Sequence, residues 1–367
     1  MQICNRCVMD STVPEIKFDD DGFCNLCTSA KERLINESEN RYKNFDEIIK
    51  YLKTIKKKYQ CIIGVSGGAD SSYVAYLLKK NNINPLAIHL DNGWNSELAT
   101  KNKEEILKKL EIDLKTYVIN WKEFKEIQLS FLRSSISNIE IPTDHAILAT
   151  LFNLASKYNL PIIHGGNLST ESIMPSSWMH DNKDLSIIKN IVKKFSNTKL
   201  KTYPQLSITR FLFYIFIKKI KYIGILNYFP YKKNEALSKL RSLGWSPYEQ
   251  KHFESIFTKF FQGYILPKKF NIDKRKAHLS SLIISNQISK DDAEKELKKN
   301  SLYDPTNIEN DKIYFCKKLD ISLEEFNQII NQDPVSSDKY SNFNKYYNFF
   351  KKQIAYVKKY ATARETY

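Results

Sequence analysis

The stretch that decides the fold is Cys61-Ile-Ile-Gly-Val-Ser66-Gly67-Gly68-Ala69-Asp70-Ser71-Ser72, and the apolar run Tyr73-Val-Ala-Tyr-Leu-Leu78 follows it. A short apolar strand here leads into a Ser-Gly-Gly turn and then into a helix. Several backbone N–H groups and the positive end of the helix dipole therefore face one small volume. A volume of this kind suits a phosphate or a pyrophosphate.

The side chains of the turn strengthen the prediction of an anion site. Gly67 and Gly68 let the backbone approach an anion, Asp70 is suited to hold Mg²⁺, and further donors come from Ser66, Ser71 and Ser72. The chain has no Gly-Lys-Ser/Thr sequence and no Gly-x-Gly-x-x-Gly spacing after this strand. An ordinary glycine-rich turn is the alternative. The order of parts resembles the PP-loop of ATP pyrophosphatases, which adenylate a substrate and release pyrophosphate.

The composition predicts a folded protein. The chain has 367 residues, of which 42% are hydrophobic and 27% charged, enough for one large or two medium domains. The longest apolar run, 211–217, ends at Lys218-Lys219 and is shorter than the roughly twenty residues that span a bilayer. The first residues show no signal-peptide core. We therefore expect a cytoplasmic enzyme with no membrane span.

The formal net charge of +16 raises the question of a polyanionic partner such as RNA or an anionic membrane. Only 8 of the 57 basic residues are arginine, the side chain that best forms paired hydrogen bonds with phosphate. We interpret most of the excess as a lysine-rich, solvated surface, and a nucleic-acid partner is not expected.

Two Cys-x-x-Cys pairs, Cys4 with Cys7 and Cys24 with Cys27, are separated by sixteen residues. This spacing predicts a zinc ribbon over residues 1–30, in which four thiolates leave no open coordination position and the metal is structural. Disulfides or a redox pair are the alternatives, and the absence of a secretory signal disfavours disulfides.

Strands and helices alternate between residues 60 and 170, which predicts a parallel α/β domain over 31–180. Strands are expected near 61–65, 86–90, 116–119 and 160–164. Because ligands bind beyond the carboxyl ends of such strands, we expect Asp91 beside the first loop. Gly165, Gly166 and Asn167 follow the fourth predicted strand and are expected to form a second wall. A simple turn is the alternative for Asp91.

The character changes after residue 180. Residues 181–330 are predicted to form a helical substrate or partner region, in which Lys274 and Arg275 begin a helix and are candidates to balance the charge of a leaving pyrophosphate. A solvated helix start is the alternative. Residues 331–345 are predicted to be a linker, and residues 346–367 a C-terminal helix.

Taken together, several ordered motifs resemble the bacterial N-acetyl sugar amidotransferase family, within the PP-loop ATP pyrophosphatase superfamily. They are the cysteine ribbon, the Ser66–Ser72 loop, Leu90-Asp-Asn-Gly-Trp94, His164-Gly-Gly-Asn-Leu-Ser-Thr-Glu-Ser-Ile-Met-Pro175 and the block 251–283. The resemblance implies conversion of an acetamido group into an acetamidino group on a sugar nucleotide or nonulosonic acid, for lipopolysaccharide O-antigen, capsule or flagellin glycan. It also implies that the strand end at Asp91 touches adenosine.

The implied chemistry fits the residues of the loop. Attack of the amide oxygen on the ATP α-phosphate would give an adenylated imidate, from which ammonia displaces AMP. The chain shows no glutaminase domain, and Gln2, not a cysteine, follows Met1. We therefore expect ammonia from a separate glutaminase subunit, as the resemblance also implies.

Two other functions remain open at this stage. A PP-loop tRNA thiolase also joins a zinc ribbon to a PP-loop, but it usually needs reactive cysteines, and only Cys61 and Cys316 remain outside the ribbon. Cys61 lies in a predicted buried strand, where a thiol is inert. A zinc-ribbon nucleic-acid module with a degenerate ATP fold is the third function, and the intact loop argues against it.

Overall fold

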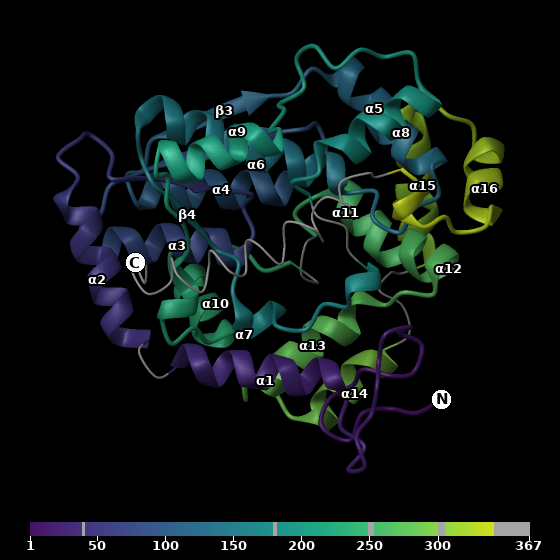
Figure 1. Cartoon of the computed structure of the whole chain (residues 1–367), viewed down its shortest axis with the longest axis horizontal. Helices are drawn as coiled ribbons and strands as arrows, with labels where there is room; N and C mark the ends of the chain where they lie inside the picture. Colours follow the sequence, from purple (N-terminus) through teal and green to yellow (C-terminus); the bar gives the residue numbers. More distant parts are fainter. Residues whose placement is uncertain (39–40, 179–181, 249–252, 300–304, 341–367) are drawn as a thin grey trace.

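The computed structural model describes residues 1–38, 41–178, 182–248, 253–299 and 305–340 (Figure 1). The helix predicted for residues 346–367 and part of the predicted linker lie outside these residues. In the described parts of the chain, no helix is long and apolar enough to cross a membrane.

A five-stranded parallel sheet forms the centre of the α/β part, in the order β3-β2-β1-β4-β5. Its strands are β1 Cys61–Gly64, β2 Pro85–Asp91, β3 Leu114–Val118, β4 Ile162–His164 and β5 Tyr222–Gly224. The predicted α/β class and four predicted strands are confirmed. The three-residue strand β5 was not predicted, and it lies within the segment expected to be helical.

Helices cover both faces of this sheet (Figure 1). On one face, α6 (Ile141–Tyr158) packs with residues 206–220 over β1 and β2. The other face is covered by α2 (Arg41–Thr54), α3 (Ala69–Lys80), α4 (Glu97–Lys109) and α10 (Lys233–Arg241). The strand order reverses between β1 and β4. In folds of this kind, ligands bind outside the carboxyl ends of the strands at such a point.

A second hydrophobic core joins the N-terminal ribbon to the later helices. Its helices are α1 (Asn25–Ser38), α5 (Trp121–Arg133), α8 (Leu185–Phe195), α11 (Ile256–Phe260), α12 (Leu266–Phe270), α13 (Lys274–Ile284), α15 (Pro305–Leu319) and α16 (Leu323–Asn331). Helix α14 (Lys290–Lys298) packs against α13. The short helix α7 (Leu168–Glu171) packs against α13, and α9 (Ile208–Leu212) lies on the α6 side of the sheet. π-helical turns follow α9 at Phe213–Ile217 and α11 at Phe261–Ile265.

Phe152 on α6 gives a direct test of the packing between α6 and β5. Its ring is fully buried and lies 5.2 Å from the ring of Phe211 and 5.5 Å from that of Tyr222, measured between centroids. We expect Phe152→Ala to lower the free energy of unfolding by about 3–5 kcal/mol, measured by urea denaturation. Ile147→Ala on the exposed side of the same helix should change it by less than about 0.5 kcal/mol, and equal losses would contradict this packing.

Candidate functional site

The loop after β1 has the backbone that the sequence predicts for an anion site. Gly67 adopts φ +90°, a conformation that favours glycine, and a Cβ there would lie 2.4 Å from the carbonyl oxygen of Ala99. Gly68 is the N-cap residue of α3, and its N–H donates to Ser66 Oγ at 3.2 Å. The first N–H groups of α3 therefore start at the loop, as anion binding at a helix N-terminus requires.

Residues far along the chain fix this loop from the outside. The carbonyl oxygen of Gly67 accepts hydrogen bonds from Trp245 Nε1 at 2.8 Å and from the Tyr248 hydroxyl at 3.1 Å. Both side chains follow α10, and no local pattern in the sequence indicated that they would reach the loop. They orient the peptide plane on which the loop conformation depends.

The segment after β4 forms the opposite wall, as the sequence suggested. Gly165 lies against the loop, where a Cβ would be 3.0 Å from the backbone carbonyl carbon of Asp70. Asn167 caps α7 by accepting a hydrogen bond from Thr170 N at 3.0 Å, and its Nδ2 donates to the Gly165 carbonyl at 3.1 Å. The cap thus holds the glycine backbone in place.

A cavity of about 470 Å³ lies between these two walls. Its lining includes Ser66, Gly68, Asp70, Ser71, Gly165 and Gly166, together with residues that the sequence analysis did not select: Lys233, Arg241 and Glu254. The two cations face the volume where an anion would sit. We call this space the loop cavity.

Carboxylates in the loop cavity fit a divalent cation. Asp70 and Glu171 both line it, and carboxylate oxygens are the ligands that Mg²⁺ prefers. The Tyr231 hydroxyl donates to Asp70 Oδ1 and orients that carboxylate. Glu254 adds a third carboxylate, with Oε1 3.3 Å from Ser66 Oγ. Asp70 and Glu171 are therefore the residues that would hold Mg²⁺.

Other predicted residues lie outside the lining of the loop cavity. Ser72 is buried on the inner side of α3. Neither Gly67 nor Asn167 is part of the cavity lining. Asp91, at the end of β2, accepts hydrogen bonds at Oδ1 from Gly93 N at 2.9 Å and Asn95 Nδ2 at 3.2 Å. Those contacts shape the turn after β2.

Lys274 and Arg275 line a second cavity of about 330 Å³, next to the first, which we call the α13 cavity. Thr170 and Lys233 line both cavities, so the two spaces adjoin. The guanidinium of Arg275 pairs with Asp273 at 2.6 Å. The charge of Arg275 is therefore already balanced by the carboxylate of Asp273, two residues before it in the chain.

A group of acidic side chains surrounds Lys274. Its Nζ lies 3.8 Å from Glu140 Oε2, and Asp144 lies on the first turn of α6 nearby. Burial and then the neighbouring Glu140 raise the pKa of Asp144 to about 7, against the opposing effect of Lys274. Asp144 can therefore exchange a proton near neutral pH, a property that the sequence did not indicate.

His164, at the end of β4, is held as a neutral imidazole. Burial lowers its pKa to about 4. Its Nδ1 is 3.2 Å from the backbone N–H of Gly166, which donates to it, and its ring stacks on Tyr222 with 4.2 Å between centroids. Protonation of Nδ1 would break the hydrogen bond that shapes the Gly165-Gly166 turn.

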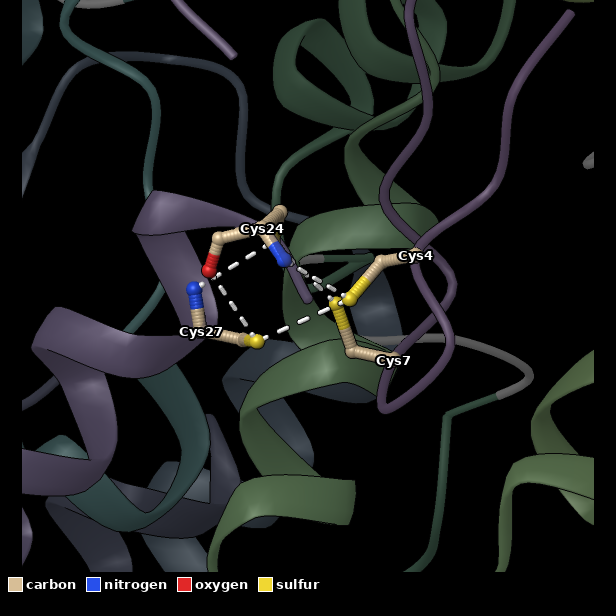
Figure 2. Close-up of side chains that lie close together, drawn as sticks. All are labelled: Cys4, Cys7, Cys24 and Cys27. Atoms are coloured by element: carbon tan, nitrogen blue, oxygen red, sulfur yellow. Dashed lines mark hydrogen bonds between the residues drawn. The ribbon is translucent and has the colours of Figure 1, made fainter. Parts of the chain in front are cut away.

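The four predicted cysteine ligands gather at one point (Figure 2). Their sulfur atoms lie within 4.8 Å of one another, with Cys4 Sγ 3.6 Å from Cys27 Sγ and Cys7 Sγ 3.7 Å from Cys24 Sγ. A tetrahedral ion with Zn–S bonds of about 2.3 Å requires sulfur separations of about 3.8 Å. All four are buried free thiols, so the disulfide alternative is not what the structure shows.

The ribbon contacts α13, the helix that lines the α13 cavity. Val8 N donates to Ser280 Oγ at 3.2 Å, and Lys276 Nζ lies 2.5 Å from the buried carboxylate of Asp10. Lys290 Nζ donates to the Cys4 carbonyl at 2.8 Å. The ribbon thereby supports the helix that carries Lys274 and Arg275.

Comparison with known families agrees with this geometry. Residues 41–140, which include the loop and β1 to β3, match the NAD synthase family. Residues 254–355, which begin at Glu254, match the C-terminal domain of the LPS biosynthesis protein WbpG-like family. Together the two matches support a WbpG-like protein that carries a PP-loop domain. Glu254 is thus the first residue of the WbpG-like match and also lies beside the loop.

Individual relatives match this WbpG-like chain over shorter stretches. An uncharacterised protein of Methanocaldococcus jannaschii is 33% identical over 113 residues, 30% of this chain and 40% of the relative. The tRNA(Ile)-lysidine synthase of Chlamydia pneumoniae is 42% identical over 50 residues, 14% of this chain and 15% of the relative. The chain thus spans less than half of either relative. The NMN synthetase structure from Francisella tularensis is 15% identical and covers 59% of this chain and 99% of its own, with a TM-score of 0.30.

Metal analysis tests the ribbon. We expect purified chain to contain one zinc ion, and Cys24→Ser to lose it because a tetrahedral thiolate site needs all four ligands. Hydrogen exchange of the α13 backbone should rise in the same variant, since the ribbon packs on that helix. Cys316→Ser removes a buried thiol outside the ribbon and should retain the metal. Full zinc content in Cys24→Ser would contradict the assignment.

The neutral His164 predicts a pH dependence of stability. Its folded pKa lies below the ordinary value, so the native state resists a proton that the unfolded chain accepts. This stability contribution is present above about pH 6.5 and is lost as the pH falls toward about 4. His164→Asn keeps an acceptor but cannot titrate in this range, so urea denaturation across it should show a smaller loss than in wild type. Parallel curves for the two proteins would contradict the neutral, buried imidazole.

Proposed function

We propose that this WbpG-like protein is an ATP-dependent amidotransferase. It would adenylate the acetamido group of an N-acetylated sugar, either a sugar nucleotide or a nonulosonic acid, and replace AMP with ammonia to give an acetamidino group. The family match supports an ATP-using enzyme and the lipopolysaccharide setting of the substrate. The proposed reaction belongs to the C–N ligase type.

One observation carries this proposal: two cavities adjoin and share Thr170 and Lys233. A ligase that adenylates its acceptor must hold ATP and the acceptor side by side, with the reacting oxygen close to the α-phosphorus. The loop cavity has the backbone and cations for the phosphates, and the α13 cavity provides the adjoining space for the sugar. Lys233 stands where the two substrates would meet.

The residues of the loop cavity suit the first step. The acetamido oxygen attacks the α-phosphorus, the bond to the β-phosphate oxygen breaks, and pyrophosphate leaves. Backbone N–H groups in the first turn of α3 and the hydroxyls of Ser66 and Ser71 would bind the departing phosphates, while Lys233 and Arg241 balance their charge. Mg²⁺ held by Asp70 and Glu171 would neutralise phosphate charge during the transfer.

The second step needs a nitrogen donor and a place for a proton. Ammonia adds to the imidate carbon, the bond to AMP breaks, and a proton leaves the nitrogen. Asp144 is the proposed acceptor of that proton, because its pKa is raised to about 7 and it lies near Lys274, which lines the α13 cavity. A separate glutaminase subunit is the proposed source of the ammonia.

A PP-loop enzyme acting on tRNA is the second candidate. The short match to a tRNA(Ile)-lysidine synthase favours a tRNA substrate. A tRNA thiolase, the sulfur-transferring kind of such an enzyme, would in addition need a reactive thiol. Burial raises the pKa of the Cys61 thiol, and it raises the pKa of the Cys316 thiol to about 11. Cys61 lies at the start of β1, which is the end of that strand opposite to the loop. Neither thiol lines the loop cavity.

The decisive assay follows AMP and pyrophosphate formation from ATP, ammonium and candidate sugars. We expect release of both products only with an N-acetylated sugar nucleotide or nonulosonic acid, and mass spectrometry should show an acetamidino product. Ser66→Ala should lower the rate on the order of a hundredfold, and Asp70→Asn at least as much, because each removes a group from the phosphate site. Zinc content should not change.

Two controls complete this assay. Asp46→Asn removes an exposed carboxylate on α2 and should leave the rate unchanged. AMP release that requires tRNA and is indifferent to sugars would overturn the amidotransferase proposal. Full activity of both loop variants would overturn the assignment of the loop.

A further inference from the structure

One helical segment turns an apolar face outward. Helix α9 and the π-helical turn after it run continuously from Ile208 to Ile217. Leu212, Phe213, Phe216 and Ile217 are 39%, 44%, 61% and 69% exposed. The other side of the segment carries Phe211, Tyr214 and Ile215, which pack against the α6 core. The exposed side chains therefore form a separate face, which we call the α9 face.

Cations border the α9 face. Arg210 lies within the helix, and Lys218 and Lys219 follow its end; all three are exposed. Lys183 Nζ lies 5.6 Å from the centroid of the Phe211 ring, which brings another positive charge to the same segment. Large apolar side chains and exposed cations thus occur together along about three turns of helix.

The sequence around this face contains no acid. Residues 185–234 include eleven lysines and arginines and no aspartate or glutamate, whereas the whole chain has a net charge of +16. Most of the charge excess therefore comes from the stretch that contains the α9 face. A uniform lysine bias would have spread it along the chain.

We propose that the α9 face binds the surface of an anionic lipid bilayer. Phe213, Phe216 and Ile217 would enter the boundary between headgroups and acyl chains, and Lys218 and Lys219 would lie at the level of the lipid phosphates. An exposed apolar patch marks an interaction surface, and the charge around this one is complementary to anionic lipid. This inference does not depend on the proposed catalytic function.

The composition of the face favours a bilayer over a protein partner. Protein interfaces are enriched in aromatic residues, phenylalanine included, and in methionine and arginine, but they are depleted in lysine, so lysine is the residue that discriminates here. Helices that lie in a membrane surface combine phenylalanine and aliphatic residues with lysine at the edge of the apolar face. The α9 face has the second composition, with phenylalanine, leucine and isoleucine beside lysine.

Vesicle flotation with the full chain tests the proposal. We expect binding to vesicles of equal parts phosphatidylcholine and phosphatidylglycerol to be at least about tenfold tighter than to phosphatidylcholine alone, and to weaken as salt is added. Lys218→Gln with Lys219→Gln should lower the affinity by a factor on the order of ten to thirty. Phe216→Ser with Ile217→Ser should abolish binding at high salt, where only the apolar contribution remains.

Matched controls separate this face from the rest of the surface. Lys108→Gln with Lys109→Gln removes the same charge from exposed positions on α4, which covers the opposite face of the sheet, and should change binding less than twofold on the scale of these measurements. Ile313→Ser removes an exposed isoleucine on α15 and should have no effect. Thermal unfolding of the α9-face variants should match wild type, because the altered side chains are exposed.

Three results would overturn the proposal. Wild-type protein could bind neither kind of vesicle, or the control variants could lose as much binding as the α9-face variants. Alternatively, the α9-face substitutions could abolish self-association or the binding of an ammonia-supplying subunit while vesicle binding is absent. That last result would assign the face to a protein partner.

Discussion

The whole arrangement depends on a close approach of two backbone segments at the carboxyl ends of β1 and β4. Gly165 lies so near Asp70 that a Cβ would meet the Asp70 backbone at 3.0 Å. This approach is possible because β1 and β4 are neighbours, and the strand order reverses between them. A side chain at Gly165 would separate the walls of the loop cavity. The sheet topology and one glycine therefore jointly decide whether the loop cavity exists.

The rest of the chain completes that site from a distance. Trp245 and Tyr248 hold the Gly67 carbonyl, and Glu254 reaches Ser66. The ribbon supports α13 through Ser280 and Lys276, and α13 lines the neighbouring cavity. The ribbon thus supports α13, and α13 in turn shapes the α13 cavity. The cysteine cluster is remote from the proposed chemistry, but through α13 it can still affect the shape of the α13 cavity.

Much of the fold could be predicted because its signals are local. The strand-turn-helix at Cys61–Leu78 and the Cys-x-x-Cys pairs each lie within short stretches, and the structure bears out the elements that they predict. Strand β5 could not be found, since three residues give no periodicity and the strand exists through its pairing with β4. Its residues lie in a region whose other signals are helical.

The site was predictable where the backbone defines it and not where tertiary contacts do. The glycines of both walls could be read from the sequence, whereas Lys233, Arg241 and Glu254 enter the loop cavity from elements far along the chain. The sequence predicted that Lys274 and Arg275 begin a helix, and the structure confirms this. Their position in the lining of the α13 cavity depends on how α13 packs and could not be predicted.

The net charge of the chain does not show where its charged residues lie. The value of +16 alone suggested a solvated lysine-rich surface, because it does not say where the charges lie. An acid-free stretch from 185 to 234 was present in the sequence, but its meaning needed the structure, which exposes Phe216 and Ile217 within it. Coulomb attraction and apolar burial act together only when they share one surface. The physical content of a net charge is therefore its distribution over the folded chain.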